Sequence, residues 1–291
     1  MKPVQKKFDN NTLFPLSLVY QDTKSTESEL PAHFHDRYEI IYVYDGEGIF
    51  FIDNVFHNIK KGDLIIIPGN TIHHTIHDKD NPVTCTVIFF NPLLIHNNSL
   101  GESFSYHQLF EKSQKAKYYK YSMQFNQQKV LESHFEDMNR ESTDAEFGFK
   151  HAILLQLHMV LHYLNRMVFP YKCEFASPNW GPLWMKDILS YIENNFTNGL
   201  SLVELANKAN VSTAHFSRVF KQMIGLNVSD YIVQKKIIMA KELLLHTDEN
   251  ISVIAERSGF QSMPHFHHTF KKHLGSTPGD YRKNRILILE T

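Results

Sequence analysis

Cysteine and long apolar runs are both scarce in this chain, and each shortage argues against a class of protein. The two cysteines, Cys85 and Cys173, lie far apart in a chain of 291 residues, which argues against a disulfide scaffold and suits a reducing cytosol. No apolar run approaches the roughly 18 residues of a membrane span, and the N-terminal lysines precede no apolar stretch. We therefore expect a cytoplasmic protein without a signal peptide and without a membrane partner.

The short motifs of common enzyme classes are also absent. The sequence contains no nucleophile elbow, phosphate-binding loop, Cys-x-x-Cys pair or dinucleotide fingerprint. The net charge of −1 is uninformative as a whole, but basic and acidic residues are distributed unevenly on the two sides of Pro182. Residues 1–182 contain 17 basic and 21 acidic side chains, whereas residues 183–291 contain 13 and 10. A mildly basic C-terminal part is compatible with contacts to nucleic-acid phosphates.

The most informative feature that is present is a repeat. One copy reads LANKANVSTAHFSRVFKQMIG, from residue 205, and the other reads IAERSGFQSMPHFHHTFKKHLG, from residue 254. Asn210 and Gly259 mark the same turn in the two copies, and both tolerate the left-handed backbone that a sharp turn requires. Two helices joined by such a turn, the second with paired Phe residues one turn apart, form a helix-turn-helix. We predict two such units, at about 200–223 and 249–273.

With this repeat, the C-terminal part resembles the AraC/XylS family of transcription regulators. The resemblance covers roughly residues 183–285 and includes the closing motif GSTPGDYR at 275–282. It implies an all-helical DNA-binding domain, residues 183–291, with about seven helices. Two units docked on one face of a duplex would enter major grooves about one turn, ~34 Å, apart. The central helix predicted between them has Tyr231, Ile238 and Leu245 among its buried residues.

Upstream, short β-rich runs separated by turn residues predict an antiparallel sandwich or barrel. The predicted strands are 39–44, 48–52, 64–67 and 84–90. The block His33-x-His35-x3-Glu39, followed by Gly62-x5-Pro68-Gly69 and then His73-His74, resembles the paired motifs of the cupin fold, a small jelly roll. Residues 1–30 read as a loose polar arm. The first domain, residues 1–124, is therefore predicted to be this arm plus a cupin-like sensor.

The histidines of these blocks allow two interpretations. In cupin enzymes the two blocks bind a metal, and here His33, His35, Glu39 and His73 would form an N3O set suited to iron, manganese, nickel or zinc. Their parity predicts that the first three share one face of a strand. Sensor domains of the resembling regulators often keep this outline without a metal, so we expect no cofactor and a pocket for a small-molecule effector. The predicted effector-binding residues are His33, His35, Glu39, Tyr42, His73 and His74.

From residue 125 the apolar pattern changes to helical spacing. In the run 149–168, the residues Ile153, Leu157, Val160 and Leu164 form one stripe, and three further leucines widen it. Residues 125–169 are therefore predicted to be helical. In the resembling regulators such helices form a dimer contact, which implies a homodimer through residues 125–168. A second layer of intramolecular core would give the same pattern. Prolines and a glycine then predict an interdomain linker over 170–182.

DNA contacts follow from the helical geometry of each repeat. Because the Phe residues are assigned to the core, the opposite side of each second helix must face the bases. Arg218 is the predicted bidentate contact to guanine, and the lysines after the Phe residues serve phosphates. His268 replaces this arginine in the second copy, so the first unit is predicted to contribute most of the base readout. The predicted DNA-contacting residues are Ser212, Thr213, Ala214, Ser217, Arg218, Lys221, Met263, His265, His267, His268 and Lys271.

Three functions compete at this stage. The first is a transcription regulator, by resemblance an activator that works with RNA polymerase and responds to a small molecule such as a carbohydrate. The second is a cupin metalloenzyme that uses the four metal-ligand candidates and carries an accessory helical domain. The third is a binding module in which the repeat is an accident. The tandem repeat favours the first, and we expect no catalytic residues.

Overall fold

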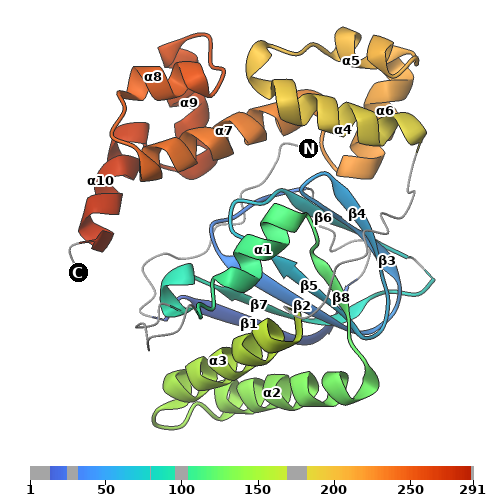
Figure 1. Cartoon of the computed structure of the whole chain (residues 1–291), viewed down its shortest axis with the longest axis vertical. Helices are drawn as coiled ribbons and strands as arrows, with labels where there is room; N and C mark the ends of the chain where they lie inside the picture. The colour runs from blue at the N-terminus through green and yellow to red at the C-terminus, as the bar shows by residue number, and fades with distance from the viewer. Residues whose placement is uncertain (1–13, 25–31, 79, 96–103, 169–181, 290–291) are drawn as a thin grey trace. The chain divides into compact units, whose positions relative to one another are not determined.

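The computed structural model describes residues 14–24, 32–78, 80–95, 104–168 and 182–289 (Figure 1). Contacts divide the chain into two compact units, one formed mainly by residues 6–178 and the other mainly by residues 179–291. The predicted linker, apart from Pro182, lies outside the described residues. Among the residues described, none of the helices combines the length and the apolar character needed to span a bilayer.

The first unit contains two antiparallel sheets, as the β-rich runs predicted. The larger has the order β1 (Leu16–Thr23), β7 (Thr84–Phe90), β2 (Tyr38–Asp45), β5 (Asp63–Ile67), β8 (Lys120–Ser122). The smaller has the order β4 (Val55–Ile59), β3 (Gly48–Ile52), β6 (His73–His77). All four predicted strands are present, with β2 paired to both β5 and β7 at the centre of the larger sheet.

Alternation along β2 separates two cores. Ile41 and Val43 belong to an apolar cluster that includes residues of both sheets, such as Phe50 on β3. Ile40 and Tyr42 belong to a second cluster, shared with the helices. Because successive side chains of a strand point to opposite faces, every second residue of β2 lies in the interior between the sheets.

The prediction of a loose N-terminal arm was wrong for residues 16–23. They form β1 and pair with β7, with Leu18 opposite Ile88. Leu16, Leu18 and Tyr20 of β1 pack against the second cluster and Val19 packs against the first, and all four are only partly buried, as expected of an edge strand. Polar residues directly after the strand hid this signal in the sequence. Also not predicted were β4, β6, β8, the helix α1 (Gln108–Ala116) and the two short 3-10 helices of the described residues.

Helices cover the outer face of the larger sheet. After η2 (Pro92–Ile95) and α1, the predicted helical segment forms α2 (Phe125–Asp144) and α3 (Phe149–Val168), which pack together along β1, β7 and β2 (Figure 1). The predicted stripe on α3 is buried in the second cluster. Of the three further leucines, Leu161 is buried, Leu154 is partly buried and Leu155 is 67% exposed. Part of the leucine excess is therefore intramolecular core.

The second unit consists of helices. They are α4 (Leu183–Asn195), η3 (Phe196–Asn198), α5 (Leu202–Lys208), α6 (Thr213–Ile224), α7 (Val228–His246), α8 (Ile251–Arg257), α9 (Met263–Leu274) and α10 (Pro278–Leu289). Within residues 182–289, the seven α-helices agree with the predicted number. The central helix α7 contacts both α6 and α9 and runs between the two helix-turn-helix units (Figure 1).

The predicted inner face of α7 was correct at Tyr231 but displaced by one residue elsewhere. Ile237 and Leu244 are fully buried, whereas Ile238 and Leu245 are only partly so. Gln234 and Lys241 also lie on the buried face. These two polar residues break the apolar pattern on that side of the helix, and so the sequence pointed to the wrong phase.

Candidate functional sites

A buried carboxylate lies between the two sheets of the first unit. Glu39 has the same parity on β2 as Ile41, and so its side chain faces the interior. Its neighbours in register are Phe89 on β7 and Ile67 on β5, both apolar. A carboxylate in such surroundings requires compensating polar partners.

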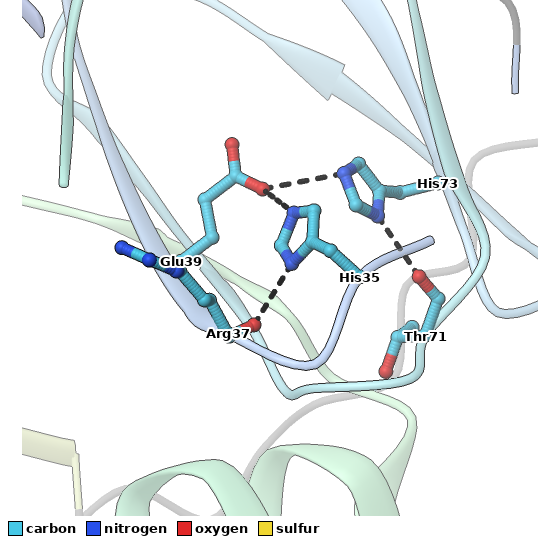
Figure 2. A network of polar contacts seen from close by, with 5 residues as sticks. All are labelled: His35, Arg37, Glu39, Thr71 and His73. Atoms are coloured by element: carbon cyan, nitrogen blue, oxygen red, sulfur yellow. Dashed lines mark hydrogen bonds and ion pairs between the residues drawn. The ribbon is translucent and has the colours of Figure 1, made fainter. Parts of the chain in front are cut away.

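Two histidines supply those partners (Figure 2). Glu39 Oε2 lies 3.0 Å from His35 Nε2 and 3.2 Å from His73 Nε2. The other ring nitrogen of each histidine faces a backbone carbonyl. His35 Nδ1 is 3.0 Å from the Arg37 oxygen, and His73 Nδ1 is 2.9 Å from the Thr71 oxygen. Glu39, His35 and His73 therefore form one buried polar cluster.

Burial and hydrogen bonding act in opposite directions on the ionisation of this cluster. Burial would raise the pKa of Glu39, but the hydrogen bonds to His35 and His73 outweigh it and hold that pKa well below its usual range. Burial lowers the pKa of His35, against the opposing effect of Glu39. The carboxylate is thus ionised in an apolar interior, and its charge requires compensation within the cluster.

The structure brings together the four residues that the sequence named for a metal. Ring nitrogens of His33, His35 and His73 lie within 4.8 Å of one another, and Glu39 contacts two of these histidines. The prediction that His33 and His35 share a strand face with Glu39 was wrong, because both precede the start of β2 at Tyr38. Convergence comes instead from the loop before β2, where the His35 ring faces the Arg37 carbonyl.

Two predicted effector-binding residues do not face the cluster. Tyr42 differs from Glu39 in parity, lies in the cluster shared with the helices, and donates a 2.6 Å hydrogen bond to Glu132 Oε1 on α2. His74 pairs with Phe51, whereas its neighbour His73 pairs with Ile52 of the interior. The two adjacent histidines therefore lie on opposite faces of β6, and only His73 joins Glu39.

A further interior histidine was missed. His57 on β4 is opposite Phe50 and buried. Burial, assisted by the charge of Lys120, lowers its pKa to about 4. The ring lies 6.1 Å from that of Tyr119. Recognition of β4 as a strand would have revealed it, because His57 has the same parity as the buried Ile59.

The outer face of α6 carries the predicted contacts of the first repeat. Phe216 and Phe220 are buried, as predicted. Ser212 caps the helix by accepting the backbone N–H of His215. Arg218 is exposed, and its Nη2 lies 3.4 Å from His215 Nδ1. His215, which the sequence reasoning left out, is therefore an exposed neighbour of the predicted base-reading arginine. The other residues of this face are Thr213, Ala214 and Lys221, all exposed, and the half-buried Ser217.

The second repeat reproduces this arrangement 50 residues later. α9 has the same length as α6, buries Phe266 and Phe270, and accepts Pro264 in its first turn, as predicted. Its outward residues are His265, His267, His268 and Lys271, with Met263 half-buried. Asn210 and Gly259 adopt φ values of 54° and 80°, which confirms the left-handed turns.

Comparison with known proteins agrees with this arrangement. A model described as an AraC-like ligand binding domain matches residues 15–157, and a model described as a helix-turn-helix domain matches residues 205–284. The chain belongs to the AraC family of transcription regulators. As a ligand-binding domain joined to a helix-turn-helix domain, this AraC-family chain is an effector-responsive, DNA-binding regulator. Its two-domain β-then-α architecture was predicted.

Three relatives illustrate the similarity of this AraC-family regulator to curated proteins. It is 26% identical over 290 residues to the "Uncharacterized HTH-type transcriptional regulator YdiP" of Escherichia coli K12, covering 96% of this chain and 92% of that protein. It is 25% identical over 272 residues to the "HTH-type transcriptional activator RhaS" of Citrobacter koseri, covering 91% of each. It is 37% identical over 100 residues to the "Bifunctional transcriptional activator/DNA repair enzyme AdaA" of Bacillus subtilis, covering 34% of this chain and 47% of that protein.

Proposed function

We propose that this regulator is a cytoplasmic transcription activator that binds promoter half-sites through α6 and α9. The observation that carries the proposal is the duplicated pair of exposed helix faces, each built over two buried Phe residues. RhaS is named an activator, which supports activation, and an activator requires contact with RNA polymerase. We assign the chain no catalytic role, because RhaS and YdiP, related over nearly its whole length, are regulators.

In this proposal α6 performs most of the base reading. Arg218 carries a rigid fork of donors that matches guanine, and the adjacent His215 nitrogen orients that fork. The matching residue of α9, His268, has fewer donors, and the charge of a histidine depends on pH near neutrality. Lys221 and Lys271, both exposed, lie where they can neutralise phosphates. α9 would then mainly position the protein on the DNA and add affinity that does not depend on the base sequence.

The effector is proposed to bind between the sheets, next to Glu39, His35 and His73. These polar groups are set in an apolar interior, which is typical of a small-molecule site. Imidazole and carboxylate groups exchange hydrogen bonds with hydroxyls, so a carbohydrate is the proposed class. Tyr42 lies on the same strand as Glu39 but contacts α2, so β2 links this site to the helices.

A homodimer through α2 and α3 completes the proposal. Leu155 and Met159, one turn apart on α3, are 67% and 53% exposed. Phe125 and Val130 on α2 are 68% and 39% exposed. Large exposed apolar side chains on both helices of the pair favour an interface. A change at β2 that shifts these helices would alter how two DNA-binding units are presented.

Selection of bound sites from random DNA tests the proposal. The full chain would be used at about 150 mM salt, because affinity for DNA depends steeply on salt, with and without a library of sugars. We expect enriched sequences with paired determinants about one helical turn apart, and a sugar that changes occupancy. Lack of enrichment over bulk competitor DNA, with or without the library, would refute DNA-binding regulation. Enrichment that no sugar alters would refute only the carbohydrate.

A further inference from the structure

The turns of the two repeats have the same backbone conformation but different surroundings. Asn210 and Gly259 adopt φ values of 54° and 80°, yet Asn210 is exposed whereas Gly259 is partly buried. A Cβ on Gly259 would lie 2.5 Å from the Cα and 2.6 Å from the carbonyl oxygen of Thr197 on η3. The backbone of η3 therefore packs directly against the second turn, at a distance that only a residue without a side chain permits.

A charged side chain of the central helix holds the same turn. Lys236 on α7 donates a 2.6 Å hydrogen bond from Nζ to the Gly259 carbonyl. The same Nζ lies 5.9 Å from the centre of the Phe260 ring, within reach of a cation–π contact. Phe260 is buried, and its ring centre is 5.0 Å from that of Phe266, a core residue of α9. Lys236 is therefore connected through this turn to the second recognition helix.

Helix α4 and η3 connect the turn to the first recognition helix. Near the start of α4, Trp184 stacks on Phe216 of α6, with ring centres 5.3 Å apart. Near its end, Glu193 forms a 2.6 Å ion pair with Lys235 of α7, and η3 follows α4 directly. The helices α6 and α9 are therefore joined by two routes, one along α7 and one through α4 and η3, and both routes reach Gly259.

The space beside this junction is not filled by side chains. A cavity of about 510 Å³ is lined by residues of η3, α8, the turn and the start of α9. Alignment of the turn with η3 therefore depends on the hydrogen bond from Lys236 and the backbone contact with Thr197 more than on apolar packing between the two elements.

We propose that Lys236 and Gly259 fix the spacing between the two DNA sequences that α6 and α9 contact. Both are positioning residues, because they act through the turn and not by touching DNA. This inference rests on the proposed binding of DNA through both helices. One added base pair moves a site by about 3.4 Å and rotates it by about 34° around the duplex. A recognition helix held rigidly at its turn cannot follow this change, so one spacing should be preferred over its neighbours.

Binding to sites of altered spacing tests the proposal. A site selected by the full chain would be remade with one base pair inserted or removed between its two determinants, and affinity would be measured by fluorescence anisotropy at fixed salt. We expect the wild type to bind the altered sites at least about fivefold more weakly, since a misaligned helix loses a base contact. Lys236→Met should reduce this difference to about twofold or less, because a charge-assisted hydrogen bond worth roughly tenfold no longer holds the turn. Lys236→Arg keeps a charged donor and should keep the preference.

Gly259→Ala and Asn210→Ala form a matched pair of turn variants. Both place alanine at a left-handed residue, but only the Cβ at residue 259 would meet the Thr197 backbone. Gly259→Ala should therefore weaken the preference for the wild-type spacing, whereas Asn210→Ala should leave it unchanged. Circular dichroism checks the fold of each variant, and Lys236→Met alone decides the matter if Gly259→Ala unfolds.

Two results would overturn the proposed spacing control and leave DNA binding intact. One is a wild type that binds the selected site tightly and the altered sites equally well. The other is a loss of affinity in Lys236→Met that is the same at every spacing, which would give Lys236 a structural role only. A wild type that selects no site would instead refute the proposed DNA binding, and this inference with it.

Discussion

The phenol of Tyr42 donates a 2.6 Å hydrogen bond to the Glu132 carboxylate, and this contact joins β2 to α2. Burial and the neighbouring Glu132 raise the pKa of Tyr42 far above its usual range, so the phenol remains a donor at every physiological pH. Glu39 lies three residues away on the opposite face of the same strand. A single strand therefore carries the buried cluster on one side and a helix contact on the other.

Replacement of Tyr42 by Phe should weaken this junction without creating a cavity. The ring would keep its packing against Tyr44 and Phe135, and only the hydrogen bond to Glu132 would be lost. A hydrogen bond to a charged group contributes about 1.5–3 kcal/mol. The free energy of unfolding of the sensor unit, measured by calorimetry, should therefore decrease by that amount. Tyr44→Phe is the control, because its longer 3.3 Å contact is with Thr86 and not with α2. Equal losses in the two variants would contradict the prediction.

Local patterns explain which features the sequence predicted. The helix-turn-helix units depend on short-range signals: the left-handed residue of each turn, and two aromatic residues one helical turn apart. Both copies therefore appeared as predicted, from Asn210 to Phe270. The convergence of His35, Glu39 and His73 was also predicted, although His35 lies in the loop before β2 and not on a strand.

The buried face of a strand or helix was harder to predict from the sequence, because tertiary packing determines it. The parity of β2 shows that Glu39 and Tyr42 point in opposite directions, but only the helix layer shows that Tyr42 is covered by α2. His73 and His74 likewise required the pairing of β6 with β3. On α7, buried polar residues such as Lys241 hid the inner face. In each case, which side of the strand or helix is buried depends on the neighbouring element that covers it, and the sequence does not show that element.

Two glycines with the same backbone conformation should respond differently to alanine. Gly259 and Gly275 have φ values of 80° and 78°, so a side chain strains both by about 1–2 kcal/mol. A Cβ on Gly259 would also lie 2.5 Å from the Thr197 Cα, whereas Gly275 has open space around it. Overpacking adds about 1–3 kcal/mol. The melting temperature of the helical unit should therefore decrease more in Gly259→Ala than in Gly275→Ala. The reverse order would show that the backbone at Thr197 moves away from the new Cβ at little cost.

The stability of the sensor unit should fall in mild acid because of His57. Burial lowers the pKa of this histidine from 6.5 to about 4, so between these values the unfolded chain binds a proton that the folded chain does not. Above pH 6.5 the histidine is neutral in both states and the free energy of unfolding is not reduced. As the pH falls from 6.5 toward 4, protonation of the unfolded chain reduces the free energy of unfolding by up to about 3 kcal/mol. Calorimetry at pH 7.5 and 4.5 should show a smaller loss in His57→Leu than in the wild type. Identical losses would assign the acid sensitivity to other groups.

The exposed apolar pair on α3 should control oligomeric state. Introduction of two like charges by Leu155→Glu together with Met159→Glu should convert a dimer into a monomer in sedimentation velocity, because buried charges without an opposite partner oppose association. Both side chains are more than half exposed in the single chain, so the variant should keep its fold. Val203→Glu, at a position 58% exposed on α5, is the control and should sediment as the wild type does. A wild-type protein that sediments as a monomer would remove the basis for this interface.

The two recognition helices should differ in their contribution to specificity. Arg218→Ala should lower affinity for a selected site by about 1–3 kcal/mol, roughly 5- to 150-fold, because a bidentate base contact is lost. His268→Ala should cost less, since a histidine offers fewer donors at the matching position. Lys221→Ala serves as the control, because a phosphate contact weakens selected and random DNA alike. Fluorescence anisotropy on both DNAs at fixed salt separates these effects, and a larger specific loss for His268→Ala would reverse the proposed order of the two units.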